Sequence, residues 1–158
     1  MDEVIVVLGQ DSRLIQQKVS LGRARVVINR DSEKGLSSTI RAGIEAVSSE
    51  SEAVILALGD QPLVSVATVD ALVQKYVETG GPVVAPYFQR WRGNPVLFAR
   101  RLFPYLVKIE GDRGAKPVIK EHGWKVVRVN VKDPGVLFDI DSEVDYRKAL
   151  EELSEGLC

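Results

Sequence analysis

Short hydrophobic runs alternate with amphipathic stretches in the first half of the chain. The apolar runs Val4–Leu8 and Ala53–Leu58 predict strands buried on both faces, because a half-exposed strand alternates apolar and polar side chains. Arg25–Asn29 predicts another strand. Helical spacing of apolar residues follows each of these runs. This βαβαβα order predicts a parallel sheet with helices on both faces.

The second half of the chain is less regular. Two further short strands are expected, together with one internal helix and a terminal helix that carries Tyr146, Leu150 and Leu153. Polar or glycine-bearing turns separate them. The predicted strands are Pro82–Pro86 and Lys125–Val129, and the helix is Leu102–Ile109. The polar loop is Gln89–Asn94, and the turns are Glu110–Lys116 and Lys132–Gly135.

Composition narrows the class of protein. With 158 residues, we expect a single domain over residues 1–158. The net charge of -1 gives no general attraction to nucleic acid or to an anionic membrane. Met1–Gln10 has neither a basic segment nor a long apolar stretch, so we expect no leader peptide. Because no apolar run has membrane-spanning length either, we expect a cytoplasmic protein. Because His122 and Cys158 are the single histidine and cysteine, catalysis is expected to use carboxylates, lysine, arginine and backbone amides.

Asp60 lies in the motif Gly59-Asp60-Gln61-Pro62, directly after the predicted strand Ala53–Leu58. A carboxylate at the end of a buried strand can hold Mg²⁺ against a triphosphate, since Mg²⁺ prefers oxygen ligands. The alternative is structural, because this sequence also forms a good turn capped by the aspartate.

A second acidic motif follows Phe138. Asp139 and Asp141 would project to the same face of a strand end, and one of them could complete a two-carboxylate site with Asp60. The alternative is a helix start, with Ser142 as N-cap and Asp145 three residues later. Both interpretations can hold together, with Ser142 capping the helix and Asp141 facing the site.

Three further motifs are ambiguous by themselves. Gly35–Thr39 can leave the backbone amides of a helix N-terminus free for an anion or a base edge, but capping by Ser37 or Ser38 is the more ordinary interpretation. Arg92–Pro95 is either a substrate-side loop or a polar turn. In Gly111–Lys116, Arg113 and Lys116 could contact phosphate, or the segment is a solvated turn.

The order of these motifs is more specific than any one of them. GLSSTIRAGI, ALGDQP, RGNPVLF, GDRGAK and DIDSEVDY together resemble the MobA/MocA-like family of molybdenum-cofactor nucleotidyltransferases, with an order similar to that of the molybdopterin cytidylyltransferases. The resemblance runs from about Val4 to about Leu150. It implies a three-layer α/β/α sandwich of the glycosyltransferase-A-like, nucleotide-diphospho-sugar transferase type, with a mostly parallel sheet.

The resemblance also implies an activity and its residues. The expected reaction transfers CMP or GMP from CTP or GTP to molybdopterin and releases pyrophosphate, with Mg²⁺ as cofactor. Asp60 and Asp141 would be the catalytic metal ligands. The nucleotide would contact Gly35, Leu36, Ser37 and Asp60, and the acceptor would contact Asn94 and Pro95.

The chain departs from the family at its N-terminal side. Family members carry a first strand and a glycine-rich loop of the form LAAGxSxRMGxxK, whereas the match here begins at the equivalent of their second strand. We therefore expect the first strand and loop to be missing through a misassigned start or truncation, to come from another polypeptide, to be replaced by homo-oligomerisation or rearrangement, or to be absent from an inactive relative.

Two functions stay open on this basis. The first is an active nucleotidyltransferase, which the two aspartates favour. The second is a catalytically inactive module that binds nucleotide or molybdopterin. A sugar-nucleotide pyrophosphorylase of the same fold is a weaker third alternative.

Overall fold

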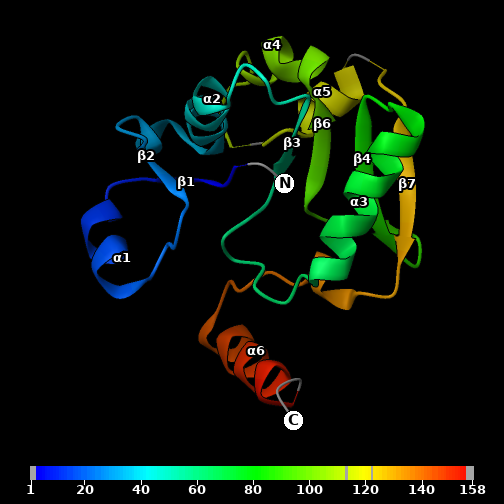
Figure 1. Ribbon diagram of the computed structural model, residues 1–158. Coiled ribbons are helices and arrows are strands. Elements are labelled where there is room, and N and C mark those ends of the chain that lie inside the picture. Colours follow the sequence, from blue (N-terminus) through cyan, green and yellow to red (C-terminus); the bar gives the residue numbers. More distant parts are fainter. Residues whose placement is uncertain (1–2, 113, 122, 156–158) are drawn as a thin grey trace. The chain divides into compact units, whose positions relative to one another are not determined.

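The computed structural model describes residues 3–112, 114–121 and 123–155 (Figure 1). Arg113, His122 and Cys158 lie outside the described residues, so the phosphate contact considered for Arg113 stays a prediction. Within the described part, no helix combines the length and the apolar character needed to cross a membrane.

The chain folds into two compact units, each assembled from two separate stretches of sequence. The first unit combines Met1–Val54 with Ala99–Trp124, and the second combines Ile55–Phe98 with Lys125–Cys158. The chain crosses between the units three times, and two of these crossings fall inside strands, β3 (Ala53–Leu56) and β6 (Val96–Ala99).

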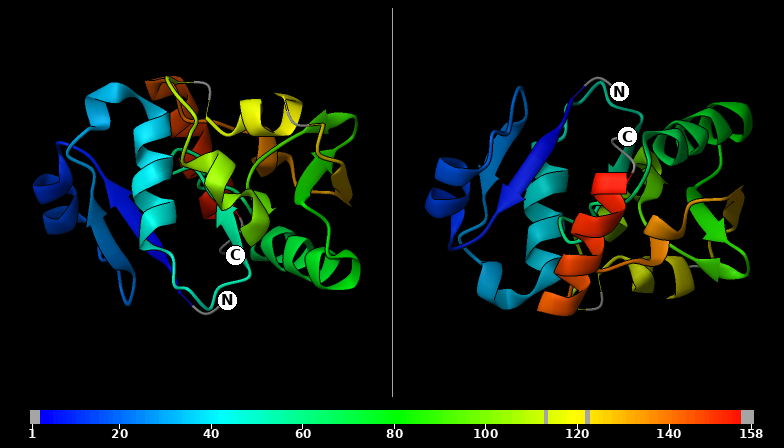
Figure 2. Two further views of the ribbon diagram at one scale, coloured as in Figure 1. Left: turned by 90° about the horizontal axis from the view of Figure 1, so that it is seen from above. Right: turned by 90° about the horizontal axis from the view of Figure 1, so that it is seen from below.

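The first unit is built on two parallel strands, β1 (Ile5–Leu8) and β2 (Arg25–Ile28), joined through α1 (Ser12–Lys18). The longer helix α2 (Leu36–Ala46) packs against both strands and buries Ile40 and Ile44 (Figure 2). Short helical segments complete the unit: η1 (Ser32–Lys34), η2 (Arg100–Leu102), α4 (Phe103–Leu106) and α5 (Lys116–Glu121).

The second unit is organised around β4 (Val83–Phe88). This strand pairs in parallel with β7 (Val126–Val131) and antiparallel with both β5 (Trp91–Arg92) and β6. The helix α3 (Val66–Thr79) packs against β4 and β7. The chain then ends with η3 (Pro134–Leu137) and α6 (Glu143–Glu155).

Antiparallel pairing in the second sheet changes the predicted architecture. The strand order is β3-β6-β4-β5, with β7 on β4, so the prediction of a mostly parallel sheet is not confirmed. The physical reason is the length of the connections: only Gln89 and Arg90 separate β4 from β5, and a parallel crossover needs a dozen or more residues. The coarser prediction of a mixed α/β fold is confirmed.

Burial is concentrated in β4 and β6 and not in the two apolar runs expected to be most buried. Every residue of β6 and the first four of β4 are buried, whereas β3 is half-buried throughout and β1 buries only Leu8. In the described part of the chain β1 pairs with β2 alone, and β3 ends the strand order of its sheet. The prediction of burial on both faces was therefore wrong for β1 and β3.

Three short segments of the second half differ from the predicted elements. The expected helix over Leu102–Ile109 is divided into η2 and the four-residue α4, with Pro104 in the first turn, where a missing amide is tolerated. The helix α5 was not predicted from its charged sequence. The short strand β5 lies inside the segment expected to be a loop, because its two residues pair with Tyr87 and Phe88.

Candidate functional site

The segment after β3 brings Asp60 beside the second acidic motif. The turn closes with a bond from the Gln61 amide to the Leu58 carbonyl at 3.4 Å, and the Asp60 side chain is exposed. The backbone N–H of Ile140 donates to the Asp60 carbonyl at 2.9 Å. The backbone at Ile140, between Asp139 and Asp141, therefore lies directly against Asp60.

A side-chain bond reinforces this backbone contact. The Gln61 Nε2 donates to Asp139 Oδ1 at 2.6 Å, across 78 positions of sequence. Gln61 is only 7% exposed, although it lies beside the exposed Asp60. Asp139 is thus held by a neutral amide donor, and the two segments are joined at two points.

The other end of the Gln61 amide is unpaired. Its Oε1 is buried and has no hydrogen-bond partner among the described residues. Turning the amide over would bring Oε1, an acceptor, against the acceptor oxygen of Asp139, so the observed orientation is the favourable one. Leaving a buried carbonyl without a donor costs about 1–3 kcal/mol.

Asp60 and Asp141 supply the carboxylates of this site that have no other partner. Within the described ranges, neither side chain accepts a hydrogen bond or forms an ion pair, and both are exposed. The described part of the chain contains no group of three or more His, Cys, Asp or Glu side chains able to bind a metal. Two carboxylates fit a hard divalent cation such as Mg²⁺, which takes its remaining oxygen ligands from water and phosphate.

Ser142 begins the final helix, as its sequence predicts. The Asp145 amide donates to Ser142 Oγ at 3.3 Å, and the Ser142 hydroxyl donates to Asp145 Oδ2 at 2.5 Å. This hydrogen bond from Ser142 lowers the pKa of the Asp145 carboxyl. Asp145 therefore acts in the helix cap, and Asp141 lies just before it.

The N-terminus of α2 differs from its prediction. The Leu36 amide donates to Asp112 Oδ1 at 3.0 Å, and the Ser37 amide donates to the Gly111 carbonyl at 3.1 Å. These amides, expected to be free for an anion or a base edge, already have acceptors. The N-cap residue is Gly35, so capping by Ser37 or Ser38 was also wrong. The GLSS and GDRGAK motifs of the sequence thus meet in the first unit.

A buried asparagine that the sequence analysis missed supports this loop. Asn29 is 6% exposed; its Nδ2 donates to Ser38 Oγ at 2.8 Å and to Thr39 Oγ1 at 3.1 Å, and its Oδ1 accepts from the Asp31 amide at 3.0 Å. The Ser38 hydroxyl also contacts the Gly35 carbonyl at 2.8 Å. This network rigidifies residues 29–39. The sequence signal that could have identified Asn29 is its position as a polar residue at the end of an apolar strand.

The predicted acceptor loop is packed against η3. The Asn94 amide donates to the Val136 carbonyl at 2.9 Å, and a Cβ at Gly93 would lie 2.3 Å from that same oxygen. Pro95 is fully buried, whereas Asn94 is half-buried. Contact with a substrate would therefore fall on the Asn94 side chain, with Pro95 as its support.

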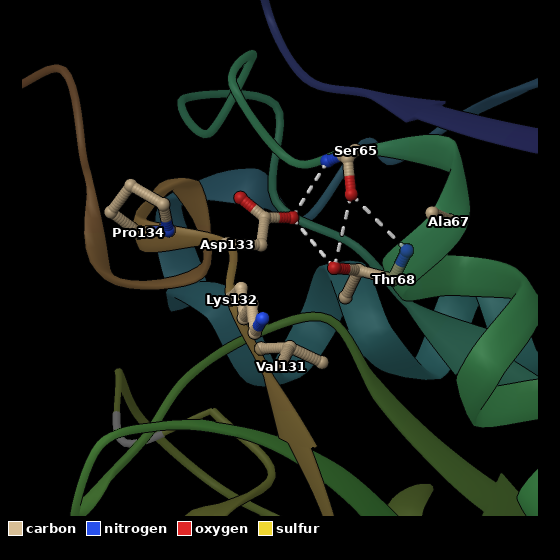
Figure 3. Close-up of a pocket in the computed structure, with 7 residues that line it drawn as sticks. All are labelled: Ser65, Ala67, Thr68, Val131, Lys132, Asp133 and Pro134. Atoms are coloured by element: carbon tan, nitrogen blue, oxygen red, sulfur yellow. Dashed lines mark hydrogen bonds between the residues drawn. The ribbon is translucent and has the colours of Figure 1, made fainter.

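An open pocket of about 420 Å³ lies elsewhere in the second unit, between the start of α3 and the end of β7 (Figure 3). Its Asp133 Oδ2 accepts from Thr68 Oγ1 at 2.6 Å and from the Ser65 amide at 2.9 Å, and its Oδ1 accepts from the Gly135 amide at 3.0 Å. Burial raises the pKa of Asp133, but these hydrogen bonds outweigh it and leave the pKa lowered. With its acceptors used, Asp133 joins α3 to β7 structurally.

Comparison with known proteins defines the class. A nucleotidyl transferase from Methanothermobacter superposes on 98% of this chain with a TM-score of 0.81 and 25% identity, which places the chain in the mixed α/β nucleotidyltransferase fold. This chain covers 74% of that structure. More particularly, the chain belongs to the MobA-like NTP transferase domain family, whose model matches residues 1–126.

Two curated relatives are similar over much of the chain. Nicotine blue oxidoreductase of Paenarthrobacter nicotinovorans is 29% identical over 92% of this chain and 74% of its own length. Purine catabolism protein PucB of Bacillus subtilis (strain 168) is 31% identical over 74% of this chain. The aligned region spans 57% of PucB, so whole-protein activities of such relatives enter here only as proposals.

Two solved mycobacterial structures are also similar. The homologue of Mycobacterium tuberculosis Rv0371c from Mycobacterium sp. strain JC1 is 28% identical, with a TM-score of 0.86 over 98% of this chain and 76% of that chain. Rv0371c of Mycobacterium tuberculosis H37Rv in complex with manganese is 27% identical, with a TM-score of 0.81 over 95% of this chain and 78% of that chain.

Proposed function

We propose that this protein transfers a nucleotide, CMP or GMP, from CTP or GTP to the phosphate of molybdopterin, with release of pyrophosphate. The observation that carries the proposal is the contact between Ile140 and the Asp60 carbonyl, which joins the two acidic motifs in a chain of the MobA-like NTP transferase family. The choice of molybdopterin as acceptor rests on the resemblance of the five ordered motifs.

The reaction mainly requires that the protein position the two substrates and neutralise charge on their phosphates. An oxygen of the acceptor phosphate forms a bond to the α-phosphorus, while the bond from that phosphorus to the bridging oxygen breaks and its electron pair leaves with pyrophosphate. Charge builds up on the phosphate oxygens, so the protein contributes by placing compensating groups around them. No covalent intermediate on a side chain is required.

Asp60 and Asp141 would hold the divalent cation, proposed to be Mg²⁺. When bound, it would neutralise triphosphate charge and stabilise the leaving pyrophosphate. Two facts support these ligands: both carboxylates lack another partner within the described ranges, and the similar Rv0371c was solved with manganese. Two hydrogen bonds join the segments that carry these aspartates, which favours a preorganised pair of carboxylates.

The remaining assignments concern the two substrates. Gly35, Leu36 and Ser37 would contact the nucleotide, although Asp112 and Gly111 now accept from the Leu36 and Ser37 amides. A nucleotide at these amides therefore has to displace or share Asp112. Asn94, supported by Pro95, would contact the acceptor.

This occupied helix terminus is the observation that favours the second candidate, a module that binds nucleotide or molybdopterin without turnover. The first test is pyrophosphate release from CTP and GTP, with Mg²⁺ or Mn²⁺ and molybdopterin. Asp60→Asn and Asp141→Asn are expected to lower kcat/KM by a factor of roughly 10² or more, because each removes a charged metal ligand. Asp70→Asn is the control, since Asp70 is exposed on α3.

The outcomes separate the two candidates. Turnover that both aspartate variants abolish, with Asp70→Asn unaffected, supports the transferase. Nucleotide binding without pyrophosphate release from a folded protein favours the binding module. Turnover that survives both substitutions contradicts the proposed metal ligands.

A further inference from the structure

Gln61 is the one side chain of the Asp60 turn that is buried, paired to the second acidic motif and unused by the proposed chemistry. It lies next to Asp60 in sequence, and it holds Asp139, which is two residues from Asp141. Its own carbonyl oxygen is buried without a partner in the described part of the chain. A buried glutamine with a purely structural role is expected to satisfy both ends of its amide.

Two hydrogen bonds join the Asp60 turn to the second acidic motif, and their positions explain the contribution of Gln61. The bond from Ile140 to the Asp60 carbonyl fixes the separation of the two backbones at one point. A single point of attachment leaves the segment 139–141 free to rotate. The bond from Gln61 to Asp139 is a second point, so it limits that rotation and with it the direction of the neighbouring Asp141 side chain.

We propose that Gln61 is a positioning residue for the divalent-cation site: its Nε2–H group holds Asp139, so that the carboxylates of Asp60 and Asp141 are directed at one cation. Asp139 is then the attachment point and not a ligand, consistent with the described residues containing no three-carboxylate group suited to a metal. This inference rests on the proposed function, because it assigns Gln61 to that same site.

Gln61→Met separates positioning from stability. Methionine has a similar length, but it removes both the donor to Asp139 and the unpaired carbonyl. We expect the affinity for Mn²⁺ to fall roughly tenfold, the range seen when groups that orient metal ligands are lost. The melting temperature without metal is expected to stay unchanged or to rise, because the buried orphan is removed.

Asp139→Asn tests the role of the attachment point. An asparagine carbonyl oxygen can still accept from Gln61, so Mn²⁺ affinity is expected to stay within roughly threefold of the parent. If Asp139 were a ligand, this variant would lose affinity as strongly as Asp60→Asn. Gln74→Met is the matched control for Gln61→Met, because Gln74 is exposed on α3 in the same unit.

The experiment is a titration with MnCl₂ followed by electron paramagnetic resonance of the free ion, with thermal melting of each metal-free variant. Weakened binding in Gln61→Met at an unchanged or higher melting temperature supports positioning. A matching loss of affinity and melting temperature overturns it in favour of a structural role. Unchanged affinity in Gln61→Met, while Asp60→Asn loses it, overturns the inference and leaves the proposed function intact. Unchanged affinity in Asp60→Asn contradicts the metal site itself.

Discussion

The carboxylate of Asp112 accepts a hydrogen bond from the backbone N–H of Leu36 at 3.0 Å, across 76 positions of sequence. An acidic side chain therefore lies at the N-terminus of α2, where the helix dipole and unpaired amides favour negative charge. The Ser37 amide is paired beside it with the Gly111 carbonyl. This contact completes the helix and also occupies the segment assigned to the nucleotide.

Removing Asp112 should weaken the first unit. We expect Asp112→Ala to lower the free energy of unfolding by about 1 kcal/mol, because the Leu36 amide loses its acceptor and the helix loses a favourable charge. Urea unfolding measures this change. Asp11→Ala is the control, since Asp11 is the N-cap of α1 but makes no side-chain cap bond, so a loss below about 0.5 kcal/mol is expected there. Equal effects of the two substitutions would contradict a capping role for Asp112.

Gly35 should tolerate no side chain. Its φ of 88° and ψ of -175° belong to a region that only glycine adopts readily, and a Cβ there would lie 2.1 Å from Asp112 Oδ1. We expect Gly35→Ala to cost about 2–4 kcal/mol, from backbone strain together with displacement of Asp112.

Gly22→Ala is the matched comparison for Gly35→Ala. Gly22 also has a positive φ, 54°, but no heavy atom lies within 4 Å of a Cβ built there. Its substitution should cost about 1 kcal/mol, from strain alone. Chemical denaturation of both variants checks the difference, and a Gly35 cost no larger than the Gly22 cost would show that Asp112 does not confine this loop.

Asp133 should give the protein an acid-sensitive contribution to stability. Because its folded-state pKa is lowered, the contribution is present above the ordinary carboxyl range and is lost as pH falls through the folded pKa. We expect Asp133→Ala to lower the free energy of unfolding near pH 7 by about 1–3 kcal/mol, since it leaves the Ser65, Thr68 and Gly135 donors unpaired.

The pH dependence distinguishes this role from a general effect of removing a charge. The difference in stability between the parent and Asp133→Ala should shrink as pH falls below the ordinary carboxyl range and the parent carboxylate protonates. Asp70→Ala, at an exposed site on α3, should change stability little at any pH. A difference for Asp133→Ala that is constant with pH would contradict a contribution from its charged form.

The two compact units should unfold together. The boundary between them runs through β3 and β6, so each of these strands contributes residues to both units. Trp91 lies in the second unit and Trp124 in the first, and each can be kept as the single tryptophan by replacing the other with phenylalanine. In each variant, we expect the urea transition reported by its tryptophan to coincide with the transition measured by circular dichroism. The two variants should also agree with each other after correction for their own stabilities. Separate transitions would contradict the single domain predicted for residues 1–158.

Part of the candidate site could be anticipated from local sequence alone. Asp60 follows an apolar run, and Ser142 and Asp145 have the spacing of a helix cap, which Ser142 indeed forms. Gln61 and Asp133 carried no comparable signal. Apart from the local contact of Asp133 with the Gly135 amide, their partners lie 65 to 78 positions away, and local patterns do not report contacts across that distance.

Periodicity and turn residues act over a few neighbouring positions, so local patterns were enough to predict the order of strands and helices in the first half of the chain and the succession of motifs that marks the MobA-like family. The direction of strand pairing, the burial of each apolar run and the pairing of polar atoms could not be predicted in this way. These outcomes depend on contacts between distant segments: β4 becomes the central strand because β5, β6 and β7 all pair with it, and the α2 N-terminus is closed by Asp112 and not by its own serines.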